Sequence, residues 1–340
     1  MQNKRFYAVL VLAVGIVLAA LHVADLLQWM DASTGFALQA SVWARYLPWL
    51  AALALPYLPA RRVAAQPTEL TDTNLPLGCC MLMTGALLLG SGLLSVSSAQ
   101  TISAYPELYA TTPAWTAWAD VITPVLAGAW LLVYGWRALT GFGVRRQKLG
   151  GALPGLVLPL AFLWRLVWRF QFVPASLGRI PCTLRVLSAV AALLFAVVLL
   201  KVFLTPGLPC GHTLFAAGAG CFLLCTCIEL PQTLFEAFNG MLTMPDLLTG
   251  LAMGVFGLCG LACTWAAAGA VLRIMRYYLN IVNRKTRALG IAGKRGFYVV
   301  WRADGVFDPS GRGLPRSGWG ELWMEGSLPP SALTRRCLPL

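Results

Sequence analysis

The stretch GALPGLVLPLAFLWRLVWRFQFV, Gly151 to Val173, decides the topology predicted for this chain. Its length suits a helix that crosses a bilayer, because about 20 mostly apolar residues span roughly 30 Å of hydrocarbon. The stretch also contains Arg165 and Arg169, together with two prolines, and these residues oppose that assignment. Whether it crosses the membrane determines on which side each later segment lies.

Seven other segments are apolar and long enough to span a membrane. The chain has 340 residues, of which 58% are apolar and 11% charged, and its mean hydropathy is +0.71. An ordinary soluble protein is about one quarter charged, so this composition excludes a water-soluble globule and predicts an all-α, polytopic integral membrane bundle. The seven segments are Phe6 to Leu27, Val42 to Ala60, Leu77 to Ser97, Ala119 to Leu139, Val186 to Leu204, Thr213 to Gln232 and Leu247 to Leu272.

The distribution of Lys and Arg favours eight spans, with both termini in the cytoplasm. Basic residues near helix ends resist translocation, whereas acidic residues have little influence. With eight spans, 21 of the 26 basic residues lie on the cytoplasmic side. If Gly151 to Val173 lay along the inner surface instead, 12 would lie inside and 14 outside. We therefore expect eight transmembrane helices in the cell membrane, with the acidic residues of the helical region mostly on the outer side.

The composition changes near the C-terminal end of the bundle. We expect residues 1–279 to form the transmembrane bundle and residues 280–340 to form a basic cytoplasmic tail, largely disordered. The tail has one short strand-like run, Phe297 to Trp301. Its positive charge suits contact with anionic lipid headgroups, although a tail without any function explains the sequence equally well.

Glu229 is the leading candidate for a binding residue. It is followed by Gln232 at i+3 and Glu236 at i+7, a spacing that places all three side chains on one helix face. The expected facing partners are Arg165 and Arg169, since an arginine and a carboxylate form a strong, directional pair in a partly dry site. The alternative is a structural ion pair that fixes two helices together.

Three further residues complete the predicted site. Asp120 is expected to add a second anionic group to the lining of an outward-facing pocket. His22 and Asp25, at i and i+3 near the outer end of the first helix, have the spacing to share a proton. A simple polar contact between the two at the membrane interface is the alternative.

The sequence argues against several other kinds of site. Cysteines recur at i+4 in two helices, but their estimated depths in antiparallel helices do not match, so no metal site is expected. No cofactor, nucleotide or catalytic motif is present, so an enzyme is less favoured than a protein without catalytic activity, and no cofactor or nucleic-acid binding is expected. The ten cysteines are better explained by the packing of small residues between helices.

Three functions remain open at this point. The first is a small-solute permease with an outward-facing pocket of mixed charge. The second is a scaffold or sensory subunit that does not transport and binds a partner protein in the bilayer. The third is an intramembrane enzyme acting on a lipid-linked substrate. Intramembrane ionisable residues favour the first, because they are costly unless they pair or line a cavity.

Overall fold

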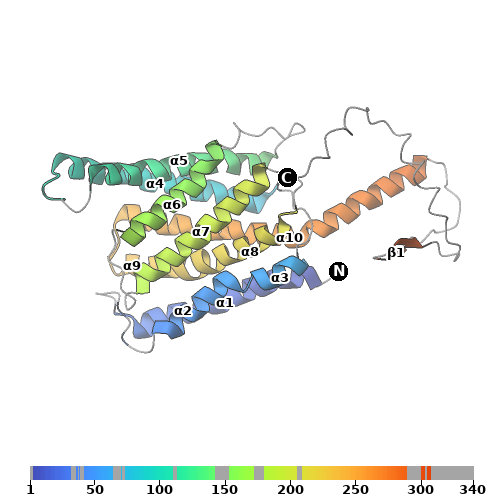
Figure 1. The fold of residues 1–340 in the computed structure, drawn as a ribbon, viewed down its shortest axis with the longest axis horizontal. Coiled ribbons are helices and arrows are strands. Elements are labelled where there is room, and N and C mark those ends of the chain that lie inside the picture. Colours follow the sequence, from blue (N-terminus) through green and yellow to red (C-terminus); the bar gives the residue numbers. More distant parts are fainter. Residues whose placement is uncertain are drawn as a thin grey trace, which may run out of the picture. The chain divides into compact units, whose positions relative to one another are not determined.

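Helices form nearly all of the described structure in this computed structural model. The structure describes residues 3–31, 36, 38, 42–63, 70, 73–109, 113–141, 153–171, 180–204, 209–288, 300–302 and 305–307. These residues fall into two compact units, Met1–Tyr278 and Leu279–Leu340. The expected all-α architecture is confirmed for the first unit (Figure 1).

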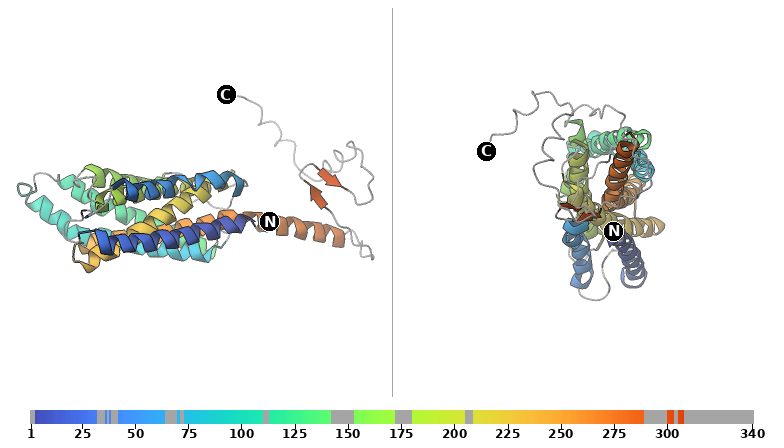
Figure 2. Two further views of the ribbon diagram at one scale, coloured as in Figure 1. Left: turned by 90° about the horizontal axis from the view of Figure 1, so that it is seen from below. Right: turned by 90° about the vertical axis from the view of Figure 1, so that its right-hand side faces the viewer.

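The first unit contains the long helices, which the right-hand view of Figure 2 shows nearly end-on. A 3₁₀ turn η1 (Pro154–Leu156) precedes α6, and a π-helical segment η2 (Phe222–Glu229) joins α8 to α9 without interruption. The helices are α1 (Asn3–Trp29), α2 (Val42–Ala54), α3 (Tyr57–Val63), α4 (Leu75–Ala104), α5 (Ala114–Thr140), α6 (Val157–Gln171), α7 (Ile180–Leu204), α8 (Gly211–Cys221), α9 (Leu230–Phe238) and α10 (Met244–Ala288).

Six helices of the described chain are long and apolar enough to cross a membrane. They cover six of the eight segments expected to span. The continuous helix α8–η2–α9 is the most enclosed of them, with 83% of its apolar window buried in the protein, against 17% for α1. The six are Phe6–Trp29, Leu75–Ala104, Ala114–Thr140, Pro181–Leu204, Gly211–Phe238 and Met244–Ala268.

The other two expected spans differ from the prediction. The segment Val42 to Ala60 is divided into α2 and α3 by a turn at Leu55 and Pro56. Proline has no N–H to donate and disfavours a helical conformation in the preceding residue, so the helix ends there. Within Gly151 to Val173, the α-helix has only 15 residues, which span about 22 Å at 1.5 Å per residue. Among the described residues, neither segment forms a single helix of full membrane length.

Glycines bring α4 and α5 into backbone contact along their length. A β-carbon placed on Gly85 would lie 2.8 Å from the carbonyl oxygen of Gly128, and one on Gly128 would lie 2.7 Å from that of Gly85. Gly78 and Gly135 face each other in the same way one heptad further along. Only glycine permits so close an approach, and similar small-residue contacts are common between membrane helices. We call these paired positions the glycine ladder.

Neighbouring helices run antiparallel, so polar residues distant in sequence meet at one end of the bundle. The glycine ladder pairs the start of α4 with the end of α5. Gly218 of α8 likewise packs against Gly260 of α10, where a β-carbon would lie 2.6 Å from the facing carbonyl oxygen. One end of the bundle is formed by the C-terminal ends of α4 and α9 and by the N-terminal ends of α5, α7 and α10. We call it the site end.

The second unit contains the end of α10 and a two-stranded hairpin. Strands β1 (Val300–Arg302) and β2 (Gly305–Phe307) are antiparallel, with Val300 paired to Phe307. The helix α10 continues to Ala288, nine residues into the region expected to form the tail. The remaining residues of the predicted tail lie outside the described residues.

Candidate functional site

The π-helical segment η2 and the helix α9 that continues it place four polar side chains in the interior of the bundle. A π turn closes hydrogen bonds from residue i to i+5, and the N–H of Leu230 bonds to the carbonyl of Cys225 in this manner. Pro231 follows directly, where an ordinary helix would lose a hydrogen bond. The predicted common face is present in the structure. Its side chains are all buried: Glu229 (1% exposed), Gln232 (0%), Thr233 (2%) and Glu236 (3%).

Glu236 is held by two partners from different elements. Nη2 of Arg185, on α7, donates to Oε2 of Glu236 and forms an ion pair with it. Nε2 of Gln232 donates to Oε1 of Glu236 at 2.8 Å. Both oxygens of this buried carboxylate are therefore bonded, which offsets the cost of removing it from water.

Arg185 also lines a cavity of about 130 Å³ at the site end. The cavity lies between α4, α5, α6, α7, the segment η2–α9 and α10, so six parts of the chain enclose it. Its lining contains carboxylates, guanidinium groups and hydroxyls, and few apolar groups. The lining residues are Ser91, Ser95, Asp120, Arg165, Arg185, Glu229, Thr233, Pro245, Asp246, Thr249 and Gly250. We call this cavity the polar pocket.

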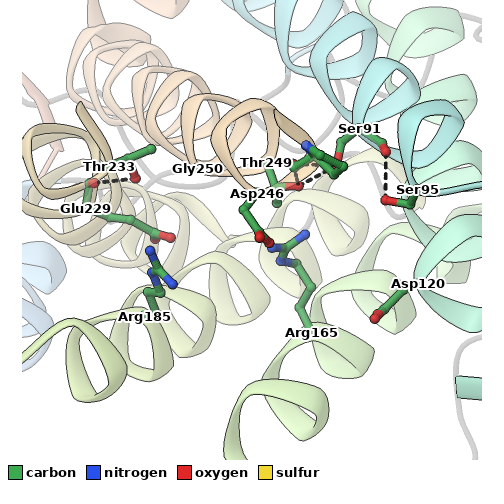
Figure 3. Close-up of a pocket in the computed structure, with 11 residues that line it drawn as sticks. Ser91, Ser95, Asp120, Arg165, Arg185, Glu229, Thr233, Asp246, Thr249 and Gly250 are labelled. Carbon is green, nitrogen blue, oxygen red and sulfur yellow. Dashed lines mark hydrogen bonds between the residues drawn. The ribbon is translucent and has the colours of Figure 1, made fainter. Parts of the chain in front are cut away.

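The charged groups of the polar pocket gather at two places. Figure 3 shows Arg185 directed toward Glu229 on one side of the pocket, and Arg165 directed toward Asp246 on the other. Asp120 lies near this second pair and interacts electrostatically with both of its members. We call Arg185 with Glu229 the first pole, and Arg165 with Asp246 and Asp120 the second pole.

Two carboxylates of the second pole are fixed by neighbouring side chains. Nε1 of Trp164 donates to Oδ1 of Asp120 at 2.7 Å. The hydroxyl of Thr243 donates to Oδ2 of Asp246 at 2.6 Å. Hydrogen bonds to charged groups are about twice as strong as those between neutral groups, so both carboxylates are held in defined orientations.

Hydroxyl groups from α4 and α10 form the wall near the second pole. Oγ of Ser91 and Oγ1 of Thr249 lie 2.5 Å apart, and both hydroxyls lie within hydrogen-bonding distance of the carbonyl oxygen of Pro245. The hydroxyl of Ser95 donates to the carbonyl oxygen of Ser91 at 2.9 Å. These hydroxyls supply donors and acceptors at the cavity surface without adding charge.

The structure brings together three of the residues singled out from the sequence. Glu229, Arg165 and Asp120 all line the polar pocket. Gln232 and Glu236 lie behind the first pole, where Glu236 bonds to Arg185. The expected arginine partner of the acidic helix face was Arg165 or Arg169, whereas the ion pair that forms joins Glu236 to Arg185. The side chain of Arg169 lies outside the described residues.

His22 and Asp25 lie outside the polar pocket, and each contacts a residue of α2. Nε of Arg45, on α2, donates to both carboxylate oxygens of Asp25. The ring of His22 packs edge-on against Trp49, with ring centroids 5.8 Å apart and an interplanar angle of 80°. Proton sharing between His22 and Asp25 stays a prediction, and the carboxylate of Asp25 is bound by a guanidinium group.

The sequence analysis did not place several pocket residues in the site. Arg185, Asp246 and the hydroxyls of Ser91 and Thr249 line the pocket, but none of them was singled out from the sequence. The distance of each of these residues from the end of its helix places it at the site end. Comparing such depths between helices could therefore have identified them from the sequence. Among the described residues, no cluster of three or more His, Cys, Asp or Glu side chains is arranged to hold a metal ion.

The fold and the site together define a class of protein, a helical bundle with the long apolar helices of a multi-pass membrane protein and a charged cavity near one end. No family model matches the chain, and comparison with curated proteins and with solved structures finds no match.

Proposed function

We propose that this protein is a small-solute permease whose substrate binds in the polar pocket. The observation that supports this proposal most strongly is the cavity itself, in which charged side chains from five helical segments face a common space. Ionisable residues within membrane helices are costly and characteristically mark substrate or ion pathways. A purely structural ion pair needs two residues and no cavity.

The irregular central helix adds support. Many transporters bind substrate where a membrane helix departs from regular α-helical geometry, and π segments are frequent at functional sites. Glu229 is the last residue of η2 and lines the pocket. The departure from α-helical geometry therefore lies at the proposed binding residue.

The proposal includes the membrane topology. We place eight passes through the cell membrane, with α2–α3 and α6 forming the two irregular ones, and both termini in the cytoplasm. The antiparallel order of neighbouring helices supports this arrangement. The polar pocket then opens toward the outside, at a depth of about 3 to 20 Å below the helix ends at 1.5 Å per residue. The basic inner surface then contacts anionic lipid headgroups.

A labelling experiment tests the orientation. Glu107, between α4 and α5, and Arg61, on α3, are exposed and lie toward opposite ends of the bundle. In a background in which the exposed Cys79 is replaced by serine, we expect a membrane-impermeant maleimide to label Glu107→Cys but not Arg61→Cys in intact cells. The reverse pattern would place the pocket on the cytoplasmic side.

Binding and flux measurements test the function. The purified chain is screened by thermal unfolding in detergent against amino acids, amines, organic acids and sugars. A ligand present at one hundred times its Kd stabilises the folded state by about 2.7 kcal/mol. We expect at least one ligand to stabilise the wild type, to act less on Arg165→Gln, and to act fully on the exposed control Arg61→Gln.

Uptake of that ligand into proteoliposomes then separates two kinds of protein. Saturable uptake by the wild type that is lost in Arg165→Gln supports the permease. Binding without uptake would instead favour the sensory subunit, and the absence of binding by any member of the panel would remove the proposed function.

A further inference from the structure

We infer that the polar pocket recognises a positively charged amine, so that its ligand is a small solute with an ammonium group. This inference rests on the proposed function and specifies the chemical class of the substrate. It follows from the balance of charges around the pocket, from what already binds its arginines, and from the donors that an ammonium group offers.

The charge of the described residues around the pocket is unbalanced. Three carboxylates line the cavity, and Glu236 is bound directly behind it. Against these four carboxylates, the described site residues supply two guanidinium groups, Arg165 and Arg185, which leaves a formal charge of −2. Within a poorly solvated bundle, an added positive charge lowers the electrostatic energy of such a site and an added negative charge raises it.

The arginines are already directed at acidic groups of the protein. Arg185 forms an ion pair with Glu236 and is directed toward Glu229. Arg165 is directed toward Asp246 and interacts with Asp120. An anionic ligand would therefore have to compete with carboxylates that the helices hold in place, whereas an ammonium group gains from those same carboxylates.

The lining also matches the geometry of an ammonium group. Such a group offers three N–H donors and no acceptor. The second pole and the hydroxyl wall provide the acceptors, namely the carboxylates of Asp120 and Asp246 and the oxygens of Ser91 and Thr249. A cavity of about 130 Å³ suits a small solute or the amine end of a longer one.

Two sources of the ammonium group are distinguishable. A simple amine uses only the carboxylates and hydroxyls. A zwitterionic amino acid would place its ammonium group at the second pole and its own carboxylate near Arg185 of the first pole. The experiment therefore compares three probes of similar size, namely ethylamine, β-alanine and propionate, which carry the amine alone, both groups, and the carboxylate alone.

Isothermal titration of the full-length protein in detergent at neutral pH measures the affinity for each probe. We expect ethylamine or β-alanine to bind at least ten times more tightly than propionate. Tighter binding of ethylamine indicates a simple amine, and tighter binding of β-alanine indicates a zwitterion. Propionate binding as tightly as the two amines, or no binding of either amine, overturns the inference.

A matched pair of variants connects the binding to the pocket. Asp246→Asn removes one negative charge from the second pole while keeping the shape of the side chain, and we expect it to weaken amine binding at least tenfold. Glu107→Gln removes an exposed carboxylate outside the pocket and should bind the amine as the wild type does. Equal weakening by both variants would show that a general surface charge attracts the amine, and would overturn the inference. Thermal unfolding without ligand verifies that both variants are folded.

The inference and the proposed function can fail separately. If organic acids or sugars bind and are transported while amines are not, the permease stands and the amine class is wrong. If no member of the broad panel binds, the proposed function itself is removed.

Discussion

Nε of Arg45 donates to both carboxylate oxygens of Asp25, at 3.0 and 2.8 Å, and so joins the start of α2 to the end of α1. The side chains are 8% and 15% exposed, respectively. A pair this enclosed leaves an uncompensated charge when either partner is removed. The contact therefore fixes α1 to its neighbour, and α1 is the least buried of the six long apolar helices of the described chain.

Neutralising either partner of this pair should destabilise the protein. We expect Asp25→Asn and Arg45→Gln each to lower the free energy of unfolding by about 3 kcal/mol. The double variant should lose less than the sum, because it leaves no unpaired charge. Chemical unfolding in detergent measures the cycle. Additive losses would show that the two side chains do not stabilise each other.

Adding a methyl group to the glycine ladder should force α4 and α5 apart. We expect Gly85→Ala and Gly128→Ala each to cost about 1–3 kcal/mol, because the new β-carbon meets a backbone oxygen that cannot move alone. Gly90→Ala is the control, since its β-carbon would meet only the end of the Leu248 side chain, at 3.2 Å. Thermal unfolding distinguishes them, and equal stability of Gly85→Ala and Gly90→Ala would contradict the packing described.

The π-helical segment should depend on one hydroxyl for its attachment to α10. Oγ1 of Thr226 donates to the carbonyl oxygen of Gly254 at 2.7 Å. We expect Thr226→Val, which preserves the shape and removes the donor, to lower the stability by about 1 kcal/mol. Thr226→Ser keeps the hydroxyl and should retain more of the stability. Thermal unfolding measures the stability of both variants. A smaller loss of stability in Thr226→Val than in Thr226→Ser would contradict this expectation.

The indole N–H of Trp164 should contribute to the second pole. Replacing Trp164 by Phe leaves the carboxylate of Asp120 without this donor, and the loss of a hydrogen bond to a charged group costs about 1.5–3 kcal/mol. Trp115, 64% exposed and packed against Trp164 with ring centroids 5.7 Å apart, is the control. We expect Trp115→Phe to change the stability by about 0.5 kcal/mol at most. Unfolding curves of similar midpoint for the two variants would argue against a specific role for the indole.

The sequence predicted the long helices well because length and hydropathy alone define them. It did not give the breaks that prolines introduce within an apolar run. Pro56 divides an apolar run that composition alone presents as one helix, and Pro154 begins the 3₁₀ turn that shortens the α-helix of Gly151 to Val173. Hydropathy averaged over a window does not detect a missing N–H group.

The sequence located the region of the site but not its pairings. The predicted topology puts Glu229, Asp120 and Arg165 at the same end of the bundle, and all three line the polar pocket. Which arginine meets Glu236 depends on which helix lies beside α9 and on how far the π segment turns that helix. Neither property can be obtained from the spacing of residues in one helix, and Arg185 was therefore missed as the partner.

The glycine ladder also determines which walls of the pocket are able to move. Ser91 and Ser95 belong to α4 and Asp120 belongs to α5, and these two helices touch backbone to backbone. Separating α4 from α5, or sliding one along the other, would move the carbonyl oxygens of each helix away from the facing glycines. The two helices are therefore expected to move together as one rigid body. If the protein is the permease proposed above, alternating access would require the segment η2–α9 and α10 to shift against a stationary α4–α5 frame.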